Sequence, residues 1–223
     1  DKFRDAFPGR FFDVGIAEQH AVCFSGGLAL AGLRPVVAIY STFFQRAIDQ
    51  VFVDVALQKA PVIFCLDRAG IVGEDGVTHQ GIFDIAMLRS VPDIVIMAPQ
   101  DGMELESMLE FAVSLDKPCV IRYPKSVSPS LESGHSALAL GVPEVLESGR
   151  DYCLIALGSM VENAMDAHEL LKKEGVSGMC INARFVKPFD AEALQEMLRQ
   201  AGNSGPVITV EDGVIEAGFG TAV

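Results

Sequence analysis

The sequence is short of basic residues. It holds 17 Lys and Arg against 30 Asp and Glu, which gives a formal net charge of −13 over 223 residues. Residues 1–125 and 126–223 are both acidic, so neither half conceals a basic domain. Because nucleic acids and acidic membrane surfaces are bound mainly through positive charge, this balance argues against both kinds of partner.

Long apolar runs are also missing. The longest candidate, residues 21–33, is shorter than a membrane span and is interrupted by Ser25 and three glycines. The opening residues DKFRDAF do not have the pattern of a signal peptide. The chain does not begin with Met, and EAGFGTAV ends within what looks like a structural element, so we expect a fragment of a longer protein.

The five cysteines do not form a pattern typical of a disulfide framework or a zinc site. Their number is odd, their spacing is wide, and four of them lie in apolar runs. This usage predicts free, buried thiols and a reducing compartment. The cysteines are Cys23, Cys65, Cys119, Cys153 and Cys180.

The first half of the chain alternates short β-branched runs with longer helical patterns, and half of all residues are hydrophobic. Such alternation predicts an α/β domain with a parallel sheet. Asp101 and Glu104 have the D-x-x-E spacing of a helix start. We expect strands at 10–14, 35–40, 61–66, 93–98 and 118–122, and helices at 17–33, at 42–59 and from Asp101.

Residues 126–150 are rich in Ser, Pro and Gly and predict a linker. The alternation then resumes, which predicts a second, smaller and incomplete α/β domain over residues 151–223, after a first domain over residues 1–125. Its expected strands are 152–157, 178–182 and 206–211, and its expected helices are 159–173 and 190–201.

Polar side chains follow the ends of the predicted strands of the first domain. Because parallel sheets bind ligands beyond the carboxyl ends of their strands, we expect these side chains to meet at one edge. Two arginines on such an edge suit a phosphate or a carboxylate. The candidates are Glu18, Tyr40, Phe43, Arg46, Asp67, Arg68, Asp75, His79 and Arg122.

Each candidate also has an ordinary structural explanation. Glu18 suits the first turn of a helix through the helix dipole alone. Arg46 has the spacing to pair with Asp49 on a helix surface, and Arg68 stands beside Asp67. Phe43 at helical spacing is typical of a core residue. Singly these explanations are adequate, and only the common edge favours a functional site.

Five motifs occur in a characteristic order. They are GIAEQHAV at 15–22, YSTFFQRAIDQ at 40–50, DRAGIVGEDGVTHQG at 67–81, RYPK at 122–125 and RFVKPFD at 184–190. With these motifs the whole chain resembles the 1-deoxy-D-xylulose-5-phosphate synthases, which are thiamine-diphosphate enzymes related to transketolase. The fold that this resemblance implies is a pyrimidine-binding transketolase-like domain followed by a truncated transketolase C-terminal domain.

The resemblance also implies roles for the candidate residues. Glu18 would bind the ring nitrogen of the cofactor's aminopyrimidine and act in catalysis, Phe43 would stack on that ring, and Arg46 would support them. Asp75 and His79 would orient the reacting oxygens or move protons. The residues expected around the substrate are Tyr40, Arg68, Asp75, His79 and Arg122, with both arginines on a phosphate.

The implied reaction is the decarboxylation of pyruvate and its carboligation to glyceraldehyde 3-phosphate. The product, 1-deoxy-D-xylulose 5-phosphate, is a precursor of isoprenoids, thiamine and pyridoxal. The implied setting is a homodimer in the bacterial cytoplasm. In the family, the domain that binds Mg²⁺ and the cofactor's diphosphate carries a GDG motif, and this sequence has no such motif. Mg²⁺ and the diphosphate are therefore expected on a missing N-terminal domain, with no metal ligand in this chain. Alone, the chain is expected to be inactive.

Two alternatives stay open from the sequence. The β-subunit of a 2-oxoacid dehydrogenase, or half of a transketolase, would share this architecture. A non-catalytic α/β interaction module would keep the fold without the chemistry. The DRAGIVGEDGVTHQG loop together with IAEQH favours the synthase.

Overall fold

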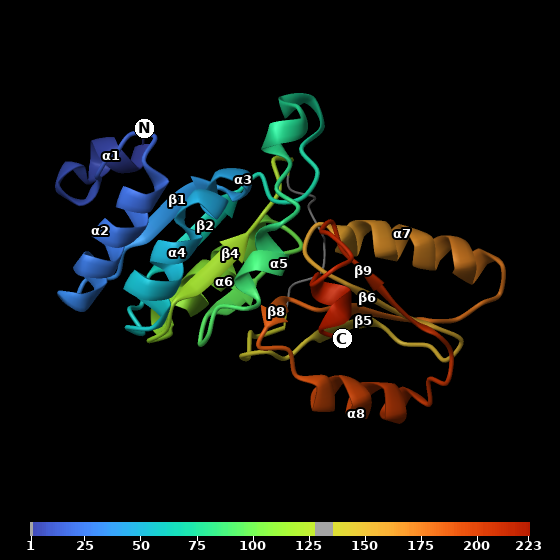
Figure 1. Cartoon of the computed structure of the whole chain (residues 1–223). Helices are drawn as coiled ribbons and strands as arrows, with labels where there is room; N and C mark the ends of the chain where they lie inside the picture. Colours follow the sequence, from blue (N-terminus) through green and yellow to red (C-terminus); the bar gives the residue numbers. More distant parts are fainter. Residues whose placement is uncertain (1, 128–135) are drawn as a thin grey trace.

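The computed structural model describes residues 2–127 and 136–223. They form two α/β domains, each built on its own sheet (Figure 1). The predicted division of the chain at residues 126–150 stays a prediction, and residues 128–135 of that segment lie outside the described residues. Within the described part, no helix has both the length and the apolar character needed to cross a bilayer.

The first sheet has the strand order β1-β2-β4-β3-β8. β1, β2, β4 and β3 run parallel, which confirms the predicted parallel sheet. Tyr40 stands opposite Asp67, and Leu66 stands opposite Arg122, so the polar ends of three strands share one edge. The strands are β1 (Val36–Tyr40), β2 (Ile63–Asp67), β3 (Val95–Met97) and β4 (Cys119–Arg122).

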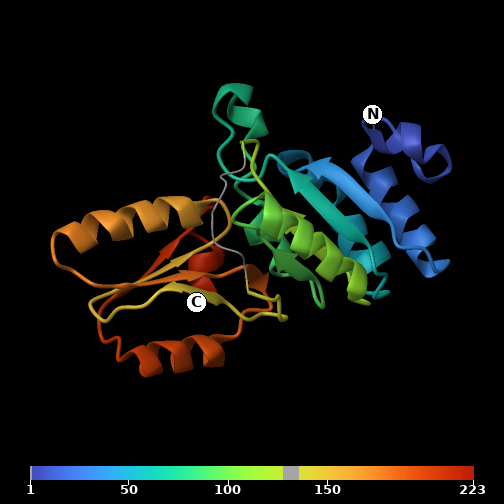
Figure 2. The same ribbon diagram turned by 180° about the vertical axis from the view of Figure 1, so that it is seen from behind.

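Buried apolar side chains cover both faces of this sheet. Phe64 and Leu66 of β2 pack in one core cluster, whereas Ile63 packs in another together with Met108 of α6 (Gly102–Ser114). Figure 2 shows α6 lying across its face of the sheet. The helix from Asp101 is confirmed, because the Asp101 carboxylate accepts a hydrogen bond from the Glu104 amide at 2.8 Å.

The chain before β1 differs from the prediction. The expected strand at 10–14 is wrong: Arg10 ends η1 (Pro8–Arg10), and residues 11–14 pair with no strand among the described residues. The run is interrupted by the charged Arg10 and Asp13 and buries none of its side chains, so it lacks the buried face that the strands of this sheet have. α1 (Lys2–Ala6) precedes it, and α2 (Glu18–Leu30) confirms the next predicted helix. A Cβ on Gly26 would lie 2.9 Å from the Asp54 carbonyl oxygen, so this glycine allows close helix packing.

The predicted helix over 42–59 is present but changes its hydrogen-bonding pattern three times. It runs through α3 (Ser41–Phe44), η2 (Gln45–Ala47), α4 (Ile48–Gln50) and η3 (Val51–Ala56), a π-helix. The wide turns bring the Leu57 amide to the Phe52 carbonyl at 3.0 Å. The tight turn at Gln45–Ala47 places Arg46 beside the first turn of α2.

The second domain confirms the predicted α/β pattern. Its sheet has the order β5-β7-β6-β9, in which β7, β6 and β9 run parallel. α7 and α8 lie on opposite sides of this sheet (Figure 1). The elements are β6 (Cys153–Ala156), α7 (Met160–Lys173), β7 (Met179–Asn182), α8 (Ala191–Ala201) and β9 (Val207–Val210), followed by η6 (Phe219–Thr221).

Three of the elements that the sequence patterns did not predict bear on the sheets and the site. β5 (Glu144–Glu147) lies within the predicted linker and runs antiparallel to β7. β8 (Phe185–Lys187) belongs to the C-terminal part of the chain but completes the first sheet, antiparallel to β3. α5 (Asp84–Leu88) is one short turn after the polar loop. Each is too short to show a period of its own.

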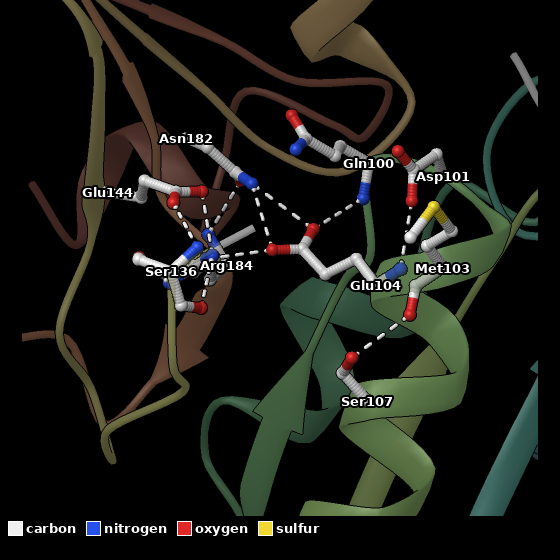
Figure 3. Close-up of polar contacts among 9 residues, drawn as sticks. All are labelled: Gln100, Asp101, Met103, Glu104, Ser107, Ser136, Glu144, Asn182 and Arg184. Atoms are coloured by element: carbon white, nitrogen blue, oxygen red, sulfur yellow. Dashed lines mark hydrogen bonds and ion pairs between the residues drawn. The ribbon is translucent and has the colours of Figure 1, made fainter. Parts of the chain in front are cut away.

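The two domains are joined by a buried network of charges. The Arg184 Nε donates to Glu104 Oε1 at 2.7 Å, and its Nη2 donates to Glu144 Oε2 at 2.6 Å (Figure 3). The Asn182 amide and the Gln100 backbone N–H also donate to the Glu104 carboxylate. One arginine therefore binds a carboxylate from each domain.

The predicted free thiols are present, but they are not all buried. All five cysteines are free, and Cys119, Cys153 and Cys180 are buried. Cys65 is half-buried, and Cys23 is exposed on α2. Burial raises the pKa of Cys65 to about 11 and the pKa of Cys119 to about 12.

Candidate active site

A buried carboxylate stands at the start of α2. Glu18 is only 7% exposed, although it lies in the first turn of the helix. Its Oε1 accepts a hydrogen bond from Arg46 Nη1 at 3.2 Å. Arg46 therefore reaches Glu18 rather than stopping at an ion pair with Asp49 on its own helix. The arginine, whose side chain is half-exposed, orients a carboxylate that is itself largely removed from water.

Aromatic rings gather beside this pair. The Phe43 ring stacks on Tyr40 with centroids 5.6 Å apart, and the His79 ring meets its edge at 5.2 Å. The Arg46 guanidinium lies 5.2 Å from the Phe43 centroid. Phe43 is half-buried rather than a core residue, whereas the neighbouring Phe44 is fully buried. Glu18, Phe43 and Arg46 thus form one contact set, as the shared edge predicted.

The polar loop over residues 68–81, hereafter the 68–81 loop, is held by hydrogen bonds between its two ends and by hydrogen bonds from α3. Gly70 and Gly81 exchange backbone hydrogen bonds at 2.8 Å. The Ser41 hydroxyl donates to the Gly81 carbonyl at 3.3 Å, and the Thr42 hydroxyl donates to Thr78 at 3.0 Å. These bonds place η4 (Gly73–Asp75) and η5 (Val77–His79) above the strand ends.

The loop carries a chain of alternating charges. The Arg68 guanidinium pairs with Asp67, donates from Nε to Asp75 at 3.4 Å, and lies 3.8 Å from the Tyr40 ring centroid. Lys125 Nζ reaches the other oxygen of Asp75 at 2.7 Å. Hydrogen bonds from Lys125 and then Arg68 hold the pKa of Asp75 below its ordinary value. Arg68 and Lys125 thus converge on one carboxylate.

Arg122 lies apart from these cations. Its side chain is 3% exposed, and it donates from Nε to Asp84 at 2.9 Å and from Nη1 to Asp212 at 2.8 Å. Its Nη2 is buried without a hydrogen-bond partner among the described residues. Burial alone would lower the pKa of Arg122, but Asp84 and Asp212 hold it above its ordinary value.

The structure therefore brings most of the predicted residues together. Glu18, Arg46, Phe43, Tyr40, His79, Arg68 and Asp75 form one continuous set of contacts. Arg122 is part of a buried ion triad and not of the open cluster.

Three participants were missed as site residues. Lys125 ends the RYPK motif, so its place three residues beyond the end of β4 was a usable signal. Asp212 also follows a strand end, but that strand belongs to the other sheet, and Asp84 lies in the short helix α5, so each meets Arg122 only in the fold.

The cluster suits an aminopyrimidine ring on one side and an anion on the other. A largely desolvated carboxylate beside half-buried aromatic side chains can share a proton with a ring nitrogen while a ring stacks alongside. Glu18 and Phe43 are thus the residues that could hold the pyrimidine of thiamine diphosphate. The described residues contain no group of three or more His, Cys, Asp or Glu side chains that could hold a metal ion.

Comparisons with known proteins identify the family to which both parts of the chain belong. The family model of the transketolase pyrimidine-binding domain matches residues 1–130, and that of the transketolase C-terminal domain matches residues 141–223. A protein of Heliobacterium modesticaldum named 1-deoxy-D-xylulose-5-phosphate synthase is 52% identical over 99% of this chain. The synthase of that name from Desulforudis audaxviator is 53% identical over 99% of it.

The chain is much shorter than these relatives, since it spans 34% and 35% of their lengths. Among solved structures, a split-gene transketolase described as an inactive β4 tetramer superimposes on the whole chain with a TM-score of 0.90 at 30% identity, and 71% of that chain is covered. A transketolase variant from Pichia stipitis gives 0.80 at 26% identity over 94% of this chain and 32% of its own. The chain therefore belongs to the transketolase family and carries its pyrimidine-binding domain followed by its C-terminal domain.

Proposed function

We propose that this chain supplies the pyrimidine-binding part of a 1-deoxy-D-xylulose-5-phosphate synthase. The observation that carries the proposal is the contact set of Glu18, Arg46 and Phe43 beside the charged 68–81 loop. The same name is borne by relatives that are 52% and 53% identical over almost the whole chain. Identity to the split-gene transketolase is lower, at 30%, which favours the synthase over half of a transketolase.

The proposed reaction joins pyruvate to glyceraldehyde 3-phosphate with loss of carbon dioxide. Thiamine diphosphate supplies, when bound, the electron sink for decarboxylating a 2-oxo acid. Glu18 holds the pyrimidine nitrogen and shares a proton with it, because a carboxyl group shielded from water is suited to that exchange. Phe43 supports the ring, and Arg46 keeps the Glu18 carboxylate in place.

Arg68 and Lys125 are the proposed partners of the substrate phosphate. Both side chains already bind the Asp75 carboxylate, each at a different oxygen, so they are close enough to bind one anionic group together. Charge-assisted bonds of this kind are among the stronger hydrogen bonds of a site. Tyr40 lies under the Arg68 guanidinium and fixes its plane. Arg122, predicted as a second direct phosphate contact, stays a prediction in that role, and its burial favours positioning.

His79 and Asp75 are the proposed proton-handling residues for the substrate oxygens. His79 lies against Phe43, and its Nδ1 lies 3.1 Å from the Thr78 hydroxyl, which leaves Nε2 as the nitrogen to face a substrate. Because histidine changes charge near neutral pH, it suits a proton donor or acceptor at a hydroxyl or carbonyl oxygen.

The remaining parts of the proposed enzyme lie outside this chain. Mg²⁺ and the diphosphate of the cofactor are proposed to bind a domain present in the longer relatives, and the working unit is proposed to be a homodimer in the bacterial cytoplasm. With only the pyrimidine contacts of Glu18 and Phe43, the isolated chain should show no synthase activity and negligible affinity for thiamine diphosphate. Calorimetric titration with cofactor and Mg²⁺ checks this expectation.

The deciding experiment replaces Glu18 by Ala in the enzyme that contains this chain together with its diphosphate-binding part. Proton–deuterium exchange at the thiazolium C2 atom should slow by about a hundredfold or more, while the circular dichroism spectrum stays unchanged. Glu74→Ala, on the exposed side of the 68–81 loop, is the matched control and should exchange at the wild-type rate. Wild-type exchange in Glu18→Ala would refute the assignment.

A further inference from the structure

The C-terminal domain reaches the candidate site through one carboxylate. Asp212 directly follows Glu211, two residues beyond the end of β9, and its Oδ1 accepts from Arg122 Nη1 at 2.8 Å. Its side chain is only 11% exposed. Arg122 and Asp84 belong to the first domain, so Asp212 is the member of the triad that crosses the domain boundary.

The second oxygen of Asp212 faces the base of the 68–81 loop. A Cβ built on Gly70 would lie 1.8 Å from Asp212 Oδ2, so no side chain fits between them. Gly70 also has a φ of +78°, which only glycine adopts without strain. The loop base is therefore seated directly on the Asp212 carboxylate.

Asp212 is held firmly by its own segment. The two oxygens of Glu211 accept from the Phe219 and Gly220 amides at 2.8 and 2.9 Å, which closes residues 211–220 into a compact loop. Arg89 of the first domain donates to the Ala217 carbonyl at 2.8 Å and anchors the same loop. These hydrogen bonds fix the backbone that carries the Asp212 carboxylate.

Arg122 links the loop over residues 211–220 to Arg68 and Lys125. Tyr123, the next residue, donates to the Leu66 carbonyl and accepts from the Ala69 amide, both at 3.0 Å. This backbone pairing continues β4 alongside the residues that carry Arg68, and Lys125 follows two positions later. A shift of Arg122 would therefore move both cations relative to each other.

We propose that Asp212 is a positioning residue of the site, which seats the base of the 68–81 loop and holds Arg122, so that Arg68 and Lys125 are spaced for a phosphate. This inference rests on the proposed function for the identity of the phosphate, and on the geometry alone for the seating of the loop.

The first test needs only this chain. In Asp212→Asn the amides of Gly70 and Gly81 should exchange with solvent about tenfold faster, because the charge-assisted bond to Arg122 is weakened. Amides of β6 should keep their rates, and Glu216→Gln, an exposed carboxylate of the same segment, should change neither. Arg122→Lys, which replaces two donor nitrogens by a single ammonium on a shorter side chain, should speed up the same two amides. Unchanged exchange in both variants would overturn the inference.

The second test uses the enzyme containing this chain. Asp212→Asn should raise the KM for glyceraldehyde 3-phosphate about tenfold, with the kcat and the KM for pyruvate and for unphosphorylated glyceraldehyde within about twofold of wild type. An equal rise for all three substrates would reduce Asp212 to a structural support and overturn the positioning role. A wild-type enzyme without synthase activity would refute the proposed function instead, and the exchange result would still decide the seating of the loop.

Discussion

Arg184 and Glu104 bind each other at 2.7 Å across the boundary between the two domains, and both side chains are almost completely buried. A second arginine, Arg122, also binds one carboxylate from each domain, Asp84 from its own domain and Asp212 from the other. The boundary is thus spanned by two buried arginines, one contributed by each domain. Since removal of one partner leaves an uncompensated buried charge, these bridges are costly to break.

We expect Glu104→Ala to lower the free energy of unfolding by about 3–5 kcal/mol, because Arg184 loses the more deeply buried of its two carboxylate partners and the Asn182 amide loses its acceptor. Urea unfolding followed by circular dichroism measures the change. Glu196→Ala is the control, since the exposed Glu196–Arg199 pair should contribute no more than about 1 kcal/mol. Equal losses in the two variants would contradict a special role for the buried bridge.

The phosphate assignment predicts selective kinetics for two cations, the partly buried Arg68 and the half-exposed Lys125. Arg68→Ala and Lys125→Ala should each raise the KM for glyceraldehyde 3-phosphate about tenfold to a hundredfold, since a charge-assisted contact is worth roughly 1.5–3 kcal/mol. The KM for pyruvate should stay near the wild-type value. Steady-state kinetics with both substrates, and with unphosphorylated glyceraldehyde as the uncharged comparison, checks this. A parallel rise for all substrates would show that the cations are structural.

The lowered pKa of Asp75 predicts how the 68–81 loop responds to acid. A carboxylate whose pKa is lower in the folded state stabilises the fold above its ordinary pKa of 3.8 and loses that contribution as the pH falls through the lowered value. Limited proteolysis of the loop should therefore accelerate only at acidic pH below that ordinary value. Asp75→Asn, which cannot ionise, should be cut at a rate that no longer depends on this titration. If the rate of proteolysis of the wild-type loop did not rise at acidic pH, the pairing of Asp75 with Lys125 and Arg68 would be contradicted.

Thiol chemistry separates Cys23 from the other cysteines. Cys23 is exposed, whereas burial raises the pKa of Cys153 to about 11 and that of Cys180 to about 12. Slight burial and Asp54 also raise the pKa of Cys23, so its reaction should be slower than that of a free thiol. With Ellman's reagent near neutral pH, one thiol should react in the native chain and all should react in denaturant. Loss of the native reaction in Cys23→Ser identifies the residue.

Much of the fold follows from local patterns in the sequence. The runs that became β2 and β6 are mostly apolar, and the apolar spacing along α7 is helical, so local pattern and tertiary structure agree there. The run at 10–14 holds two charged residues, buries no side chain and forms no strand, although β1 has a free edge. β8 shows the converse case, because three residues gain strand structure only from β3, which lies far away in sequence.

The candidate site follows the same division. The convergence of Tyr40, Asp67 and Arg122 at the strand ends was predictable, since register in a parallel sheet brings such residues to one edge. The sequence does not predict which of the two arginines, Arg68 or Arg122, remains accessible to solvent. That outcome depends on Asp84, which α5 brings to Arg122 within the first domain, and on Asp212, whose approach is set by the packing of the two domains.

The pairing of β8 with β3 has a consequence for how the protein is made. The first sheet has an unfinished edge when residues up to Arg122 have been synthesised, and it stays so until Phe185–Lys187 have emerged. During that interval β3 offers unpaired backbone groups, which invite association with other chains. Residues 1–130 alone should therefore be a poor unit for expression, and the domain that sequence similarity delimits is smaller than the unit that can complete its own sheet.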